Sequence, residues 1–128
     1  MGRIPEKLIE RKLVEGVQWL GGVAYKWVCP GHAGVPDRIV LLPHGRMLFV
    51  ELKALGGQPS PSQRDMAARF ARLGFPVRIV YGLEGVRQLL EELRTWQERA
   101  TVFVGHRADS ITRGKLIAPW EGGGADAL

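Results

Sequence analysis

Three charged residues interrupt two short apolar runs in the first half of the chain. Asp37 precedes the run 38–42, and Glu51 and Lys53 end the run that begins at Met47. The turn residues between the runs predict a β-hairpin, in which the start of one strand lies beside the end of the other. Two carboxylates at that edge repel each other unless a cation lies between them, and oxygen ligands suit Mg²⁺ or Mn²⁺. With a lysine to hold an attacking water or a phosphate, this combination predicts metal-assisted phosphodiester cleavage.

The loop length of this hairpin decides whether the two carboxylates share a face of the sheet. A four-residue loop over 43–46 would place Asp37 opposite Leu52, so that Asp37 and Glu51 would point to opposite faces. The predicted site therefore requires a loop of three or five residues, or a bulge. Gly45 is compatible with a three-residue loop and a bulge.

Each of these residues alone also has an ordinary structural explanation. Asp37 follows a proline and is a typical turn residue, whereas Glu51 and Lys53 would form an ion pair on an edge strand. The Glu-x-Lys spacing is not specific, because residues 10–12 also have it. That second match lies in a predicted helix, where residues two apart do not share a face. All three charges on one hairpin favour a functional site.

The same residues carry a resemblance to a known family. Pro36-Asp37 followed by Glu51-Leu52-Lys53 resembles the signature of PD-(D/E)xK nucleases, and a glutamate in the first helix together with Gly34–Asp37 and Glu51–Ala54 is similar to their VRR-NUC branch. The resemblance covers residues 4–93. It implies an α/β restriction-endonuclease-like fold with a central mixed β-sheet flanked by helices, in the order α-β-β-β-α-β-α.

The resemblance also implies a role for each site residue. Asp37, Glu51 and the backbone carbonyl of Leu52 would bind one or two Mg²⁺ or Mn²⁺ ions, and Lys53 would orient or deprotonate the attacking water. In similar proteins a glutamate of the first helix completes the metal site. We expect Glu10 in that role.

The choice of Glu10 rests on the pattern of the first predicted helix, residues 5–20. At 100° per residue, Glu10 falls at the margin of the apolar stripe that includes Ile9, Leu13 and Val17. Glu6 lies near the stripe at the end of the helix and ranks second. The alternative for Glu10 is an ion pair with an arginine.

A second predicted helix begins with a capping box, with Ser60 at the N-cap and Gln63 three residues later. Gln63 has two explanations of equal weight: it caps the backbone, or it is the polar residue that the family places near the site. This helix is expected to run to Leu73 and to bury Met66, Phe70 and Leu73.

The remaining pattern completes an α/β domain. Strands are expected at 22–28 and 77–81, and a helix at 83–97; a strand-helix-strand link of this length implies a mixed sheet. We assign residues 1–99 to the nuclease-like domain and residues 100–128 to a C-terminal extension. Within the extension, 101–104 and 111–120 would form an added strand pair or an arm, and 121–128, with three consecutive glycines, would be disordered.

Composition agrees with a single domain of 128 residues that has a polyanionic partner. Lys and Arg number 18 against 13 Asp and Glu, a formal net charge of +5. The one cysteine, Cys29, excludes an internal disulfide and suits a reducing cytoplasm, and its expected role is that of a small, partly buried apolar residue. No apolar run approaches the ~20 residues of a membrane span, so no membrane partner is expected.

These observations favour a metal-dependent DNA endonuclease over two alternatives. One alternative is a catalytically silent nucleic-acid-binding or interaction domain on the same scaffold, and the other is an unrelated basic α/β protein. No helix carries the Arg/Asn/Gln cluster that base readout requires, so we expect selection by DNA shape, such as branched or flapped DNA. A homodimer would suit such a substrate, with Tyr25, Trp27 or the apolar part of 101–120 at its contact.

Overall fold

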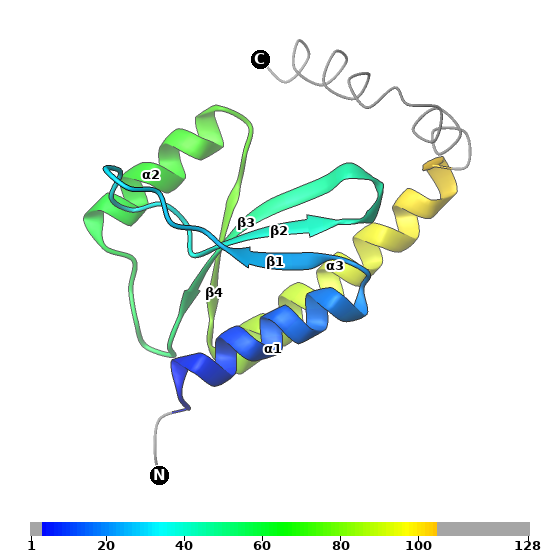
Figure 1. The fold of residues 1–128 in the computed structure, drawn as a ribbon, viewed down its shortest axis with the longest axis horizontal. Helices are drawn as coiled ribbons and strands as arrows, with labels where there is room; N and C mark the ends of the chain where they lie inside the picture. Colours follow the sequence, from blue (N-terminus) through cyan, green and yellow to red (C-terminus); the bar gives the residue numbers. More distant parts are fainter. Residues whose placement is uncertain (1–3, 105–128) are drawn as a thin grey trace.

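Four strands form one mixed sheet in the order β1-β2-β3-β4 (Figure 1). β1 (Val23–Lys26), β2 (Arg38–Leu42) and β3 (Arg46–Lys53) pair antiparallel, and β4 (Val77–Tyr81) pairs parallel with β3. Three helices complete the predicted order α-β-β-β-α-β-α: α1 (Glu6–Trp19), α2 (Pro61–Arg72) and α3 (Gly82–Val104). The computed structural model describes residues 4–104, and their side chains up to residue 98.

One face of the sheet is covered by α1 and α3, which lie side by side (Figure 1). Apolar residues at helical spacing on both helices meet every second residue of the strands, as the two periodicities require. Their shared core is formed by Ile9, Leu13, Val17, Ala24, Val40, Leu42, Leu48, Val50, Leu52, Val80, Val86, Leu89 and Leu93, all less than 9% exposed. This core holds the strands through the face that packs on α1 and α3. The residues of the opposite face are therefore not needed for that core.

The opposite face is covered only in part, by α2. Phe70 of α2 contacts Phe49 of β3 and Trp27, with ring centroids 4.9 and 5.9 Å apart, and Phe75 follows at 6.4 Å from Phe49. The burial predicted for this helix is wrong at one position, because Leu73 is 55% exposed. Met66 and Phe70 are half-buried. Leu73, the C-cap residue of α2, therefore lies outside the core.

The hairpin has the loop length that the predicted site required. Pro43–Gly45 forms a three-residue turn, in which His44 and Gly45 have positive φ angles of 69° and 71°. Pairing then runs from Leu42 opposite Arg46 to Arg38 opposite Val50. Asp37 consequently comes next to Glu51 rather than opposite Leu52, and no bulge is needed within the paired residues.

The third helix extends further than predicted. α3 ends at Val104, so residues 101–104 are helical and do not begin a strand pair. Helical backbone therefore crosses position 99, where we placed the domain boundary. Residues 105–128, including the apolar segment 111–120 and the glycine-rich end, lie outside the described residues. No helix in the described part of the chain is long and apolar enough to cross a membrane.

Candidate active site at the end of the hairpin

Asp37 is held by hydrogen bonds to two strands. Its carbonyl oxygen accepts from the Trp27 amide at 2.9 Å, which extends the pairing of β1 and β2 by one residue. Its side-chain Oδ2 accepts from the Leu52 amide at 3.0 Å, which fixes the carboxylate against β3. Pro36, which precedes it, is buried. The backbone thus determines where the Asp37 carboxylate lies before any ligand binds.

Glu51 is a buried carboxyl between the apolar residues Val50 and Leu52 of β3. It is 3% exposed, and its Oε1 has no hydrogen-bond partner among the described residues. Burial, a hydrogen bond to Asp37 and the Asp37 charge raise the pKa of Glu51 to about 8. Desolvation and a neighbouring like charge both disfavour the ionised form, so this carboxyl retains its proton at neutral pH unless a cation approaches.

Lys53 lies on the same face as Glu51, because side chains two residues apart in a strand point the same way. It is half-buried, and its positive charge lowers the pKa of Glu51, opposing the larger effects of burial and Asp37. The three charges predicted to meet at the end of the hairpin therefore do so.

The structure places the two glutamates of the first helix in different surroundings, and the metal role of each stays a prediction. Glu10 forms an ion pair with Arg38, with Oε2 and Nη2 3.9 Å apart. Arg38 follows Asp37 in the strand and points to the opposite face, toward α1, where its Nη1 also donates to the Ala24 carbonyl at 3.2 Å. Glu10 is thus on the helix-covered side, in the arrangement named as its alternative. Glu6, ranked second, is the α1 carboxylate whose charge raises the pKa of Glu51.

Comparison with known proteins identifies the family. The family model of the VRR-NUC domain matches residues 23–84. The protein named "Putative nuclease p44", from Acyrthosiphon pisum secondary endosymbiont phage 1, is 49% identical over 80 residues, which are 62% of this chain and 86% of the relative. A solved structure named "VRR_NUC domain" has a TM-score of 0.64 and 33% identity, over 67% of this chain and 94% of that chain. The chain belongs to the VRR-NUC family.

A second solved structure supports the fold alone. It is named "VRR_NUC domain protein" and has a TM-score of 0.54 at 16% identity, over 70% of this chain and 88% of that chain. The VRR-NUC match over 23–84 includes Asp37, Glu51 and Lys53 but begins after α1. The family match therefore does not choose between Glu6 and Glu10.

Gln63 caps α2, as one of its two explanations predicted. Its Oε1 accepts from the Ser60 amide at 2.8 Å, and the Ser60 hydroxyl accepts from the Gln63 amide at 3.2 Å. The start of α2 nevertheless lies close to the site, since a Cβ on Gly34 would come within 2.3 Å of the Ser62 carbonyl oxygen. Gly34 also has a positive φ of 87°. The close approach of the Ser62 backbone and the positive φ angle together explain why position 34, three residues before Asp37, is a glycine.

The carboxylates fit a divalent cation in chemistry. Carboxylate oxygens are the ligands that Mg²⁺ and Mn²⁺ prefer, and Glu51 has a buried oxygen without a partner beside a second carboxylate. Within residues 4–98 no group of three or more His, Cys, Asp or Glu side chains converges as a metal site. The residues in place to hold an ion are therefore Asp37 and Glu51, with the Leu52 carbonyl as a backbone candidate.

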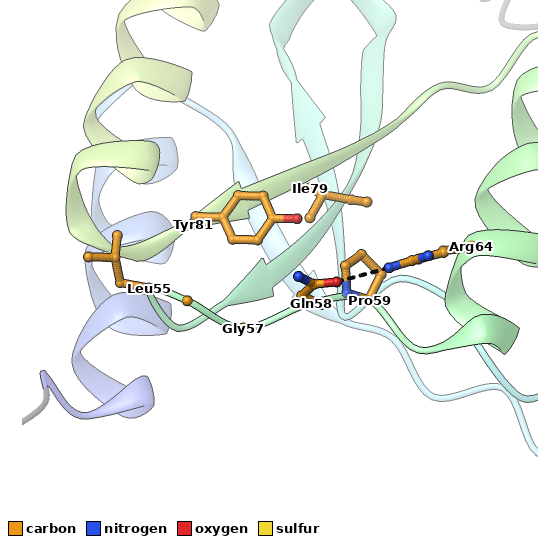
Figure 2. Close-up of a pocket in the computed structure, with 8 residues that line it drawn as sticks. Leu55, Gly57, Gln58, Pro59, Arg64, Ile79 and Tyr81 are labelled. Carbon is orange, nitrogen blue, oxygen red and sulfur yellow. Dashed lines mark hydrogen bonds between the residues drawn. The ribbon is translucent and has the colours of Figure 1, made fainter.

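Two site features were missed by the sequence analysis. Arg38 is 14% exposed, and its Nε is buried without a partner among the described residues. Its Nη2 pairs with Glu10, so a charged pair lies behind the site. An arginine within an apolar strand, next to Asp37, was the available signal. The other feature is a groove beside β4 (Figure 2). Its lining comes from a loop, a strand and a helix far apart in sequence, so spacing gave no signal for it.

Proposed function

We propose that this protein is a metal-dependent endonuclease that hydrolyses phosphodiester bonds in DNA. The observation that carries this proposal is the buried Glu51 carboxyl next to Asp37, with one oxygen that has no partner within the described part of the chain. In a VRR-NUC fold such a pair would destabilise the protein unless it served a ligand. A divalent cation offsets the repulsion and gives the free oxygen a partner.

Each residue has a distinct part in the proposed reaction. Asp37, Glu51 and the Leu52 carbonyl would hold Mg²⁺ or Mn²⁺, and Glu6 would add negative charge from α1. Such an ion supplies a water of lowered pKa and offsets charge on the phosphate. Lys53 would orient the attacking water or accept its proton, and would stabilise the negative charge that develops on the phosphate.

The proposed DNA contact is on the side of the sheet that carries α2. Arg69 and Arg72 lie on the exposed surface of that helix, and neither forms an ion pair within the described residues. Unpaired arginines bind phosphates without reading bases, which gives sequence-tolerant and salt-sensitive binding. The net charge of +5 has the sign that this requires.

Selection of DNA by shape, and a homodimer, remain part of this proposal. Tyr25 is 59% exposed and Leu41 and Met47 are 39% and 42% exposed, so the sheet face beyond α2 offers an apolar patch. Register places them together, since Leu41 is opposite Met47 and also pairs with Val23, two residues before Tyr25. Two copies joined there would present two sites to one branched or flapped DNA.

Plasmid nicking tests the proposal. The purified protein should convert supercoiled plasmid to nicked circles with Mg²⁺ or Mn²⁺, and EDTA should stop the reaction. Glu51→Gln should be inactive, and Glu15→Gln, at an exposed glutamate of α1, should nick like the parent. DNA binding without nicking in either metal would indicate the silent binding domain instead. A panel of flaps, junctions and linear duplex would then show whether shape is selected.

A further inference from the structure

A groove of about 680 Å³ borders the proposed site on the β4 side (Figure 2). Parallel pairing of β3 and β4 places Ile79 beside Glu51 and Tyr81 beside Lys53. Paired residues in neighbouring strands point to the same face, so both side chains project on the site side. The groove is lined by Leu55, Gly56, Gly57, Gln58, Pro59, Arg64, Ile79 and Tyr81. It begins next to the carboxylates and leads away from them across β4.

The lining combines an aromatic ring, aliphatic surface and a cation. Tyr81 is 38% exposed and Leu55 is 76% exposed, so both present apolar surface to solvent. Arg64, at the start of α2, donates from Nη2 to Gln58 Oε1 at 3.1 Å, which orients the guanidinium from across the loop (Figure 2). No acidic residue is among the lining residues. The charge therefore favours an anion, and the ring favours a flat partner.

An unpaired nucleotide combines these two properties. A base stacks on an aromatic side chain, and its phosphate is neutralised by a nearby arginine. The groove volume lies within the ~300–1,000 Å³ of small-ligand sites. A space of this size admits an unpaired nucleotide.

We propose that this groove binds an unpaired nucleotide of the DNA strand beside the bond that is cut. Tyr81 stacks on its base, and Arg64 contacts its phosphate. The proposal rests on the nuclease function proposed above and narrows its substrate: DNA with unpaired nucleotides next to a duplex, such as a flap or a gap, is preferred over continuous duplex. Both Tyr81 and Arg64 then determine specificity and take no part in the chemistry.

Metal-free binding separates this role from catalysis. The probe is a duplex with a short single-stranded tail that carries 2-aminopurine, whose fluorescence is quenched on stacking, and the reference is the fully paired duplex. We expect Tyr81→Ala to weaken binding of the tailed probe by roughly ten-fold or more and to abolish the quenching, with affinity for the paired duplex unchanged. Tyr81→Phe should keep both properties, because the ring is retained. Arg64→Ala should also weaken tailed binding while the quenching of bound probe persists.

An exposed aromatic residue outside the groove is the matched control. Trp19 is 90% exposed, ends α1 and does not line the groove, so Trp19→Ala should bind both probes like the parent. The groove assignment is overturned if Tyr81→Ala binds the tailed probe normally, or loses tailed and paired DNA equally. Plasmid nicking by the parent, measured in parallel, separates failure of the groove proposal from failure of the proposed nuclease function. If the parent nicks DNA and Tyr81→Ala has no effect on binding, only the role of the groove is rejected. If the parent neither binds nor nicks DNA, the nuclease function is rejected as well.

Discussion

The two faces of the central sheet carry different kinds of side chain, even along the single strand β3. Toward α1 and α3, β3 presents Leu48, Val50 and Leu52, which are 7%, 0% and 2% exposed. Toward α2 it presents Glu51, which is 3% exposed and so lies within the same range, and then Lys53. Burying aliphatic surface stabilises the fold, whereas burying a carboxyl with a partnerless oxygen costs stability. The aliphatic face thus provides the stability that lets the other face hold a reactive group.

The two faces also differ in whether their arginines form ion pairs. On the α3 side, arginines are paired with carboxylates, in Arg78–Glu92, Arg87–Glu84, Arg94–Glu91 and Arg94–Glu98. On α2, none of the arginines forms an ion pair within the described residues. Paired surface charges contribute little field at a distance, and unpaired ones attract polyanions. This difference places the positive field on the side of the carboxylates.

The largest expected effect is the loss of cleavage on changing the carboxyl residues of the α2-facing side, compared with a loss of stability on changing the apolar core. Asp37→Asn and Glu51→Gln should abolish plasmid cleavage, since each removes a proposed metal ligand. Neither should greatly lower the free energy of unfolding, since each replaces a carboxyl group with a neutral amide of the same size. Leu89→Ala, at a 1% exposed core position of α3, should do the reverse: a loss of ~2–5 kcal/mol in stability with normal cleavage by the folded fraction. Denaturant melts and nicking assays measure both. Parental cleavage by Asp37→Asn would refute the site.

Lys53 should affect turnover without affecting the metal. An ammonium is not a ligand, so Lys53→Ala should lower cleavage turnover by about 10²–10⁴ while Mn²⁺ affinity falls little. Because Lys53 lowers the pKa of Glu51, its loss should also shift the rise of the pH–rate profile to higher pH. Lys26→Ala, an exposed lysine of β1, is the control and should leave both quantities unchanged. An unshifted profile with full turnover would exclude Lys53 from the site.

A smaller effect should distinguish the two glutamates of α1. Glu6→Gln should weaken Mn²⁺ binding by about ten-fold, an outer-shell magnitude, because the Glu6 charge acts on Glu51. Glu10→Gln should leave metal affinity unchanged and lower stability by up to ~1 kcal/mol, because it removes the pair with Arg38. Calorimetric titration and denaturant melts measure the two. The opposite result would restore Glu10 as the residue that completes the site.

The smallest expected effect concerns the arginines of α2. The double variant Arg69→Ala/Arg72→Ala should reduce DNA affinity several-fold and make the salt slope shallower by about 0.9 for each phosphate that is no longer neutralised. The matched double variant Arg87→Ala/Arg94→Ala, on α3, should bind like the parent, since both arginines already pair with glutamates. Fluorescence anisotropy at several salt concentrations measures this. Equal reductions in both variants would remove the distinction between the two sides.

Local sequence signals predicted the architecture and the meeting of the charges. The apolar runs around residues 43–46 predicted the hairpin, and strand alternation required the three-residue loop that Pro43–Gly45 forms. The capping box at Ser60 and Gln63 was also visible in sequence, because its donors and acceptors are three residues apart. These features depend on neighbours in the chain, which is why the sequence was sufficient for them.

The features that the sequence left open or predicted wrongly depended on partners distant in the chain. A helical wheel placed Glu10 near the core but could not show that Arg38 of β2 lies 3.9 Å from it. The same pattern predicted burial of Leu73, although α2 covers only part of its face and leaves Leu73 exposed. The groove is lined by a loop, β4 and α2, which are far apart in the sequence. Only the fold places Tyr81 beside Lys53 and makes Tyr81 and Arg64 line the same groove.

Calorimetric titration of Mn²⁺ into the parent and Glu51→Gln tests the central claim most directly. The metal-free Glu51 carboxyl has a pKa of about 8, so at neutral pH an ion must displace its proton. We predict that binding releases close to one proton at about pH 7, tightens as the pH rises from about 6 to about 9, and is lost in Glu51→Gln. Equally tight binding by Glu51→Gln, or an affinity that does not change over this range, would contradict the assignment of Asp37 and Glu51 as the metal site.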